Sequence, residues 1–184
     1  MPTVIVIGDG PGGLSAALFL AKNKVDVIVF GDDKSAMHYA HIKNYLGLPE
    51  IAGAEFQKRA REQVAALGAR LRPDRIEEIS GTSGRFQVVT DNAERLTAKY
   101  LILSEGKGPR LAKTLGLAFD EGKGIATDRN AHTSVEGVYV VGRSARPGRS
   151  QAIISAGDGA AAAIDILSRE AGRDVLDWDE PPGS

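Results

Sequence analysis

The chain has 184 residues, 23 Lys plus Arg against 24 Asp plus Glu, and no cysteine. The absence of cysteine excludes structural disulfides, a C-x-x-C redox pair, a thiolate nucleophile and a cysteine-ligated metal within this sequence. The balanced charge, without any lysine- or arginine-dense run, argues against a nucleic-acid-binding surface, and no apolar stretch is long enough to span a bilayer.

The first predicted element is a short apolar strand over residues 4–7, so close to the N-terminus that it leaves no room for a signal peptide. We therefore expect a soluble, cytoplasmic protein, and the length suits one domain with a sizeable core. A helix is predicted over residues 14–23 and a second strand over residues 25–30.

The glycine-rich turn between the first strand and this helix fits a dinucleotide pyrophosphate. It reads Gly8-Asp9-Gly10-Pro11-Gly12-Gly13, which is the pattern G-x-G-x-x-G. Gly8 permits the tight turn, Gly10 removes the Cβ that would keep a pyrophosphate away from the backbone, and Gly13 lets the helix pack closely on the strand. Glycine-rich turns are common, but this one opens a helix whose N-terminus offers free N–H groups and partial positive charge. The context therefore predicts a dinucleotide-binding turn.

The remaining elements predict an α/β fold. Residues 31–50 have mixed polarity and are predicted to form a long loop of the kind that covers a ligand. Residues 53–67 show helical spacing of apolar side chains, with Gly68 just past the predicted C-terminus. Further strands are predicted at residues 70–71, 75–79, 86–90, 95–96, 100–103, 125–126 and 138–141, and further helices at residues 111–115 and 151–170. This order indicates a doubly wound parallel sheet with a β-meander on one crossover.

The histidines do not predict a metal site. His38 and His41 have the i, i+3 spacing of a shared helical face, but no third ligand stands near them. Both lie in the loop expected to approach the ligand, where an imidazole can donate a proton, and they are the candidates for catalysis. The alternative is that they are inert, as most surface histidines in loops are.

Five motifs follow one another along almost the whole chain. They are the glycine turn and helix at residues 8–22, the segment Asn44-Tyr45-Leu46-Gly47-Leu48-Pro49, the strand and turn at residues 100–106, the segment at residues 133–142 and the helix start at residues 151–161. In this order they resemble the flavin-binding domain of low-molecular-weight thioredoxin reductases, within the FAD/pyridine-nucleotide disulfide oxidoreductases. The resemblance implies a Rossmann-like FAD-binding domain.

The resemblance also implies where FAD binds. The pyrophosphate belongs at the glycine turn, Asn44 lies beside the cofactor, and the backbone of Gln151 and Ala152 faces the pyrimidine edge of the flavin. A helix N-terminus there directs positive potential at a reduced flavin, although plain packing explains the apolar residues of this helix equally well. Asp32 follows the second strand, where an acidic residue usually binds the adenosine ribose. The cofactor-binding residues expected in full are Gly8, Gly10, Pro11, Gly12, Gly13, Asp32, Asn44, Glu105, Gly106, Gly142, Arg143, Ser150, Gln151 and Ala152.

The chain departs from the family pattern in three places. The NADPH-binding domain and its dithiol, which full-length reductases insert after the A-T-G strand, have no counterpart between Gly106 and Leu111. Glu105 replaces the threonine of A-T-G, and Arg143 replaces an aspartate that normally hydrogen-bonds the ribityl chain. These two residues either form an ion pair or are independent solvent-facing changes, and we favour the second because exposed pairs contribute little. A second G-x-G-x-x-A pattern at residues 157–162 lies inside the last helix, where small residues are expected to permit close helix packing.

The sequence therefore predicts a single FAD-binding domain over residues 1–170, assembled from residues 1–106 and 110–170. An acidic tail over residues 171–184 follows, in which Trp178 is expected to be an anchor. The predicted function is flavin-only redox chemistry, with electrons supplied by external NAD(P)H or a redox partner protein, in a homodimer. The alternative is a non-catalytic FAD- or nucleotide-binding sensor or scaffold subunit.

Overall fold

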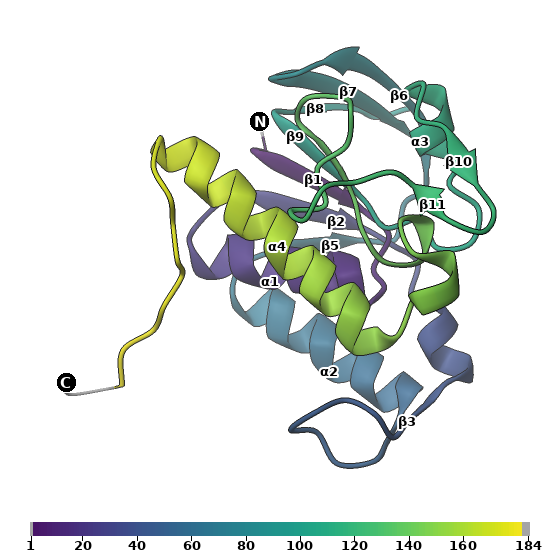
Figure 1. The fold of residues 1–184 in the computed structure, drawn as a ribbon. Helices are drawn as coiled ribbons and strands as arrows, with labels where there is room; N and C mark the ends of the chain where they lie inside the picture. The colour runs from purple at the N-terminus through teal and green to yellow at the C-terminus, as the bar shows by residue number, and fades with distance from the viewer. Residues whose placement is uncertain (1, 182–184) are drawn as a thin grey trace.

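A five-stranded parallel sheet forms the centre of the computed structural model, which describes residues 2–181 (Figure 1). The strand order is β12-β9-β1-β2-β5, so β1 lies in the middle with β2 and β9 on its two sides. Four of these strands are short apolar runs that are buried along their whole length, as expected of parallel strands covered on both faces. The bounds are β1 Val4–Ile7, β2 Val27–Phe30, β5 Arg70–Arg72, β9 Tyr100–Leu103 and β12 Val138–Val140.

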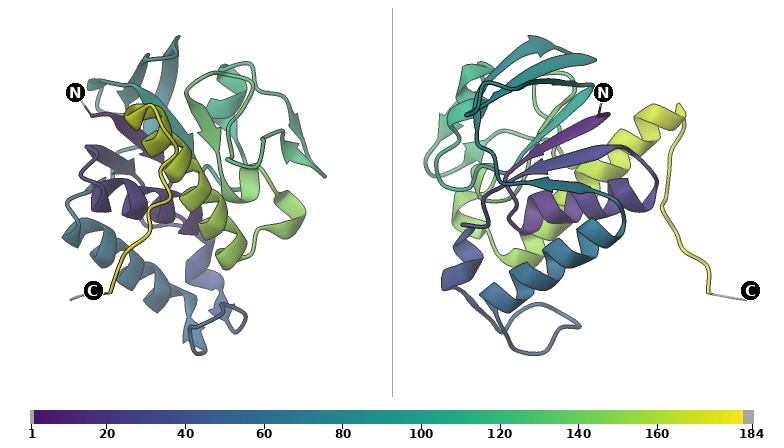
Figure 2. Two further views of the ribbon diagram at one scale, coloured as in Figure 1. Left: turned by 60° about the vertical axis from the view of Figure 1, so that its left-hand side comes forward. Right: turned by 180° about the vertical axis from the view of Figure 1, so that it is seen from behind.

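Three long helices cover one face of this sheet: α1 (Pro11–Lys22), α2 (Gly53–Ala66) and α4 (Ala152–Ala171) (Figures 1 and 2). The closest approach is between α1 and α4. A Cβ added to Gly159 would lie 2.0 Å from the carbonyl oxygen of Gly12, so the two backbones are in direct contact. The predicted packing role of the small residues in α4 is therefore confirmed at this glycine.

The opposite face is covered by an antiparallel β-meander and the short helix α3 (Arg110–Thr114). The meander consists of β6 (Ile76–Thr82), β7 (Arg85–Thr90) and β8 (Arg95–Ala98). Phe86 and Val88 of β7 are fully buried in the same apolar cluster as Leu101 of the central sheet. The parallel sheet with a β-meander crossover is thus confirmed, but meander strands take the place of the long helices that a doubly wound sheet has on its second face.

Several short elements differ from the prediction. The loop expected over residues 31–50 contains a 3₁₀ turn at Ala36–Tyr39 and the strand β3 (His41–Ile42), which pairs with β4 (Ile51–Ala52). A second two-residue ladder joins β10 (Phe119–Asp120) to β11 (Gly124–Ile125). Two residues are too few to display the alternation by which a strand is recognised in a sequence.

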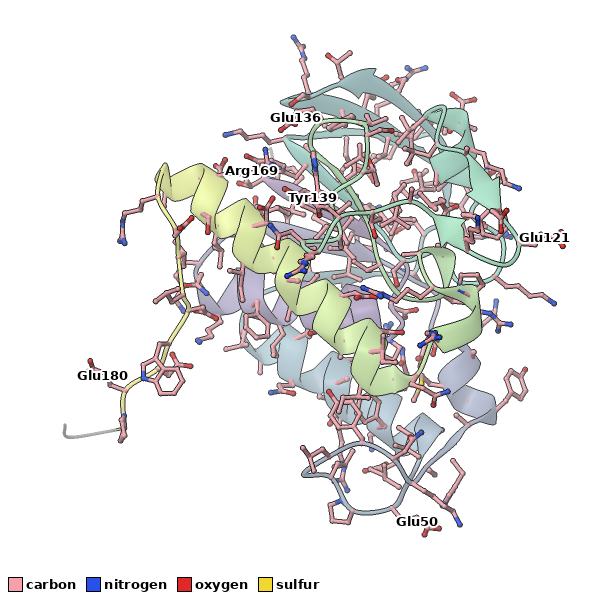
Figure 3. The ribbon with its side chains drawn as sticks, in the orientation of Figure 1. Glu50, Glu121, Glu136, Tyr139, Arg169 and Glu180 are labelled. Carbon is pink, nitrogen blue, oxygen red and sulfur yellow. The ribbon has the colours of Figure 1, made fainter. Side chains whose placement is uncertain are left out.

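A polar cluster fastens α4 to the sheet at the end remote from its N-terminus. The hydroxyl of the fully buried Tyr139 donates to Asp165 at 2.6 Å, and Arg169 donates to Asp165 at 2.7 Å and to Glu136 at 2.5 Å. Figure 3 shows Glu136, Tyr139 and Arg169 together at this end of α4. Burial, followed by the hydrogen bond to Asp165, raises the pKa of Tyr139, which keeps this hydroxyl a donor. The cluster holds α4 against β12.

The C-terminal tail lies against the end of α1 through charged residues. Lys22 is 3.2 Å from Asp177 and 2.5 Å from Asp179, while the side chain of Trp178 between them is 83% exposed. The prediction that Trp178 is an anchor is therefore wrong, because its two acidic neighbours turn towards Lys22 and leave the indole facing outward. Residues 182–184 of the predicted tail lie outside the described residues. Within residues 2–181 no helix is long and apolar enough to cross a membrane.

Candidate functional site

A cleft of about 800 Å³ lies beyond the carboxyl ends of β1, β2 and β9. Ligands bind at this edge of open α/β sheets. The cleft brings together segments that are far apart in the sequence, namely the turn after β1, residues 31–44, residues 104–108 and the start of α4. The predicted cofactor-binding residues that line it are Gly8, Gly10, Pro11, Gly12, Asp32, Asn44, Glu105, Gly106, Gly142, Arg143, Ser150, Gln151 and Ala152.

The glycines of the turn have different tasks. Gly8 has a φ of +104°, and a Cβ there would lie 2.1 Å from the carbonyl oxygen of Ser104. Gly13 is not among the lining residues; its Cβ would lie 2.0 Å from the carbonyl oxygen of Gly8. Gly10 differs from both, because the nearest atom to its added Cβ is the Ser104 hydroxyl at 4.0 Å. Gly8 and Gly13 therefore shape the turn, and Gly10 keeps the cleft open.

Two helix N-termini meet this cleft without a side-chain cap. Helix α1 begins after Gly10 and α4 begins after Gln151, and neither has an acidic residue in its first turn. Free N–H groups at such positions attract anions. The amide of Asn44 donates to the side-chain oxygen of Gln151 at 3.0 Å, which ties the loop after β3 to the start of α4.

The third helix N-terminus at the cleft is capped by Glu105. Its carboxylate accepts hydrogen bonds from the N–H groups of Leu111 at 2.7 Å and Ala112 at 2.9 Å. In the described residues it forms no ion pair with Arg143, which is exposed and lines the cleft. Neither interpretation from the sequence holds for Glu105, because the short connection from β9 folds its side chain back onto α3.

Replacing Glu105 is expected to change how stability depends on pH. Burial raises the pKa of Glu105 above its ordinary 4.5, although the two N–H donors oppose the rise. The folded protein then keeps this proton to higher pH than the unfolded chain does, so the contribution of the group is complete below pH 4.5 and is lost as the pH rises through the folded-state pKa. Denaturant unfolding should show the stability of wild type falling relative to Glu105→Gln as pH rises. The exposed control Glu121→Gln should follow wild type, and a Glu105→Gln difference that is constant with pH would contradict the assignment.

The acidic residue inside the turn had no predicted role. Asp9 is only 5% exposed, and its carboxylate accepts hydrogen bonds from the guanidinium of Arg61 and from the N–H of Asp33. Its carbonyl oxygen accepts from the side-chain amide of Gln57 at 2.6 Å. Burial raises the pKa of Asp9, and Arg61 opposes that rise most strongly. Because Arg61 and Gln57 both belong to α2, this helix is tied to the turn.

The predicted ribose-binding acid, Asp32, and the two histidines predicted as catalytic candidates are engaged with neighbours. Asp32 is 2.9 Å from Lys34, whose hydrogen bond lowers the pKa of Asp32. His38 lies 3.1 Å from Asp33 and is not among the lining residues, whereas His41 lines the cleft and is 2.5 Å from Glu50. Among residues 2–181 there is no group of three or more His, Cys, Asp or Glu side chains that could hold a metal ion.

Positive charge lines the cleft beyond what the sequence suggested. Arg75 and Lys107 line it together with Arg143, and the side chains of all three lack a hydrogen bond or ion pair within the described part of the chain. Of the four acidic lining residues, Asp9, Asp32 and Asp74 are each paired with a cation, and Glu105 binds backbone N–H groups of α3. The charge of the cleft without an ion-pair partner in the described residues is therefore mainly positive. Arg75 and Lys107 belong to no binding motif of the sequence, so no local pattern revealed them.

The comparison with protein families agrees with this geometry. Residues 46–159, more than half of the chain, match the family model for pyridine nucleotide-disulphide oxidoreductase. The chain belongs to this family. Family members are FAD-binding flavoproteins, so FAD is the cofactor, as the sequence predicted.

Relatives and solved structures extend the comparison. A thioredoxin reductase of Peptoclostridium acidaminophilum is 32% identical over 145 residues, which cover 74% of this chain and 45% of that protein. A ferredoxin–NADP reductase of Lactococcus lactis is 29% identical, over 64% of this chain and 39% of that protein. A thioredoxin reductase structure from Gloeobacter violaceus superposes with a TM-score of 0.83 at 17% identity, over 97% of this chain and 98% of that chain. The chain spans less than half the length of the two sequence relatives.

The cleft fits FAD. Its volume suits a large ligand, and the missing Cβ of Gly10 leaves room for a phosphate against the backbone. Two uncapped helix N-termini offer donors to a pyrophosphate at one place and to the flavin ring at another.

Proposed function

We propose that this chain binds FAD in the cleft and works as a flavin-dependent oxidoreductase. The observation that carries the proposal is the convergence of two uncapped helix N-termini and the open face of Gly10 on one cleft of about 800 Å³. Gly10 and the first turn of α1 would hold the pyrophosphate, and the start of α4 would hold the isoalloxazine ring. When bound, the flavin supplies one- or two-electron exchange at its ring.

The chain's own residues orient the cofactor and stabilise charge. The N–H groups at the start of α4 would stabilise the negative charge that a flavin held there gains on reduction. The hydrogen bond between Asn44 and Gln151 holds that edge of the cleft in place. Since the chain has no cysteine, it contains no dithiol through which electrons leave the flavin. The donor is external NAD(P)H or a partner protein, and the unpaired cations of the cleft favour an anionic one. A cytoplasmic homodimer remains a prediction, to be tested by light scattering and cell fractionation.

The proposal is tested by the yellow colour of bound FAD and by the loss of that colour on reduction. Purified protein, supplemented with FAD and freed of excess, should be yellow and should bleach anaerobically with NADH, NADPH or a reduced ferredoxin. A preparation that never retains FAD would overturn the proposal.

One observation favours a second function, a non-catalytic FAD-binding sensor or scaffold subunit. The acid–base side chains at the cleft are engaged: Glu105 caps α3 and His41 pairs with Glu50. Protein that holds FAD but is bleached by none of the three reductants would support this second function over the first.

Arg143 is expected to strengthen FAD binding. Its guanidinium is exposed, lines the cleft and has no ion-pair partner in the described residues, so it is available to the anionic cofactor. Arg143→Ala should weaken FAD binding about tenfold, the size of one charge-assisted contact. The control is Arg149→Ala, an exposed arginine nearby that does not line the cleft. Equal FAD dissociation constants for the two variants, measured by flavin fluorescence, would remove Arg143 from the site.

A further inference from the structure

The end of β2 lacks the side chain that usually meets the ribose of a dinucleotide. In folds of this type an acidic group after the second strand hydrogen-bonds a ribose hydroxyl. Here β2 ends at Phe30 and the next residue is Gly31. A Cβ added to Gly31 would lie 2.3 Å from Cγ and 2.6 Å from Oδ1 of Asp9. The carboxyl group of Asp9 therefore fills the space that a side chain at position 31 would take.

The two oxygens of this carboxylate differ. Oδ2 accepts hydrogen bonds from the Arg61 guanidinium and, at 3.1 Å, from the N–H of Asp33. No other described residue donates a hydrogen bond to Oδ1, the N–H of Asp9 itself is the remaining donor to this carboxylate, and Asp9 lines the cleft. One oxygen is thus held in place by the protein, and the other is left for a ligand.

The acids that follow β2 are less suited to the task. Asp32 lines the cleft, but its carboxylate binds the Lys34 ammonium group at 2.9 Å. Asp33 does not line the cleft, and its side chain contacts His38 at 3.1 Å. Asp9 alone of these three acids combines a fixed position with an unused oxygen at the cleft.

We propose that Asp9 is the residue that recognises the adenosine ribose, in place of an acid after β2. Oδ1 accepts a hydrogen bond from a ribose hydroxyl, and Arg61 is a positioning residue that holds the carboxylate through Oδ2. The ligand class is therefore an adenine dinucleotide with an unphosphorylated ribose, because a phosphate on this ribose would meet a fixed carboxylate. This inference rests on the proposed function, since it places the adenosine half of FAD in the same cleft.

The test pairs a change in the protein with a change in the ligand. Binding of ADP and of 2′,3′-dideoxy-ADP is measured by calorimetry for wild type, Asp9→Asn, the competing acid variant Asp32→Asn and the control Asp91→Asn, an exposed residue that does not line the cleft. Asp9→Asn should weaken ADP binding about 10- to 100-fold, as expected on losing a hydrogen bond to a charged group, and should leave binding of the dideoxy analogue unchanged. Asp91→Asn should bind both ligands as wild type does, and Asp32→Asn should show no loss that depends on the ribose hydroxyls. Gly31→Ala, whose methyl group displaces the Asp9 carboxylate, should reproduce the ribose-dependent loss and serves as a second variant if Asp9→Asn fails to fold.

The other outcomes overturn the inference. Equal losses for ADP and the dideoxy analogue would mean that Asp9 only shapes the turn. A ribose-dependent loss in Asp32→Asn would make that residue the ribose acid. In a third outcome, wild type retains FAD, and both Asp9→Asn and Gly31→Ala bind ADP as tightly as wild type. This result would refute the role of Asp9 and leave the proposed function standing. Wild type that binds neither FAD nor ADP would refute both.

Discussion

Gly10→Ala is expected to weaken FAD binding about 100-fold and to leave the melting temperature unchanged. The backbone of Gly10 has a φ of −71° and a ψ of 177°, which any L-residue adopts, so the substitution adds no strain. The added methyl group touches no protein atom closer than 4.0 Å and instead occupies the cleft beside the N-terminus of α1. There it keeps the pyrophosphate away from the N–H donors, and loss of about two such bonds corresponds to the stated factor.

The measurement is the FAD dissociation constant from flavin fluorescence, together with the melting temperature from circular dichroism. Gly148→Ala is the matched control, because an added Cβ there meets nothing within 4 Å and the residue does not line the cleft. If Gly10→Ala bound FAD as tightly as Gly148→Ala, the glycine turn would not be the pyrophosphate site.

Gly159→Ala is expected to destabilise the fold by about 3 kcal/mol, although alanine is the better helix former. Inside an exposed helix this change would gain about 1 kcal/mol. At this position the new methyl group would lie 2.0 Å from the carbonyl oxygen of Gly12 and 3.0 Å from the backbone nitrogen of Ala16. Neither backbone atom can rotate away, so α4 must shift from α1, and overpacking of this kind costs about 1–3 kcal/mol or more.

Gly157 provides the control within the same helix. It is exposed, and an added Cβ meets nothing within 4 Å, so Gly157→Ala should gain about 0.5–1 kcal/mol. Urea unfolding of both variants should show changes of opposite sign in the free energy of unfolding, a loss for Gly159→Ala and a gain for Gly157→Ala. Stabilisation by both substitutions would refute the close contact of α1 with α4.

The long elements and the cofactor turn were predictable because their signals are local. The strands β1, β9 and β12 are buried on both faces and are therefore continuous apolar runs. Such a run can be recognised in the sequence without knowing which elements pack against it. Helix α1 begins at Pro11, three residues before its predicted start, since the glycines of the turn concealed its first turn.

The polar contacts of the cleft were not predictable in the same way. Asp9 meets Arg61, which lies 52 residues away, so no short-range spacing encodes that contact. Glu105 meets N–H groups only six and seven residues further along the chain, but an ordinary N-cap residue lies two or three residues before the N–H group that it binds. The sequence therefore suggested solvent for Glu105 and nothing for Asp9. Arg75 and Lys107 were not predicted either, because they reach the cleft from the residue before β6 and from the connection after β9, and only the fold brings these two places together.

The backbone contact between Gly12 and Gly159 also sets the distance between the N-termini of α1 and α4. Because no side chain stands between α1 and α4 where Gly12 meets Gly159, the spacing of the two uncapped helix starts is set there by touching main-chain atoms rather than by rotamers. The two helix starts are therefore preorganised at a fixed spacing, and little conformational entropy is lost when a ligand of matching length binds. On the proposed placement, FMN, which has the same ring system and one phosphate, reaches both helix starts, whereas a nucleotide without such a ring system reaches only the start of α1. A preference for ligands of this ring-to-phosphate length, before any recognition of the adenine base, follows from two glycines.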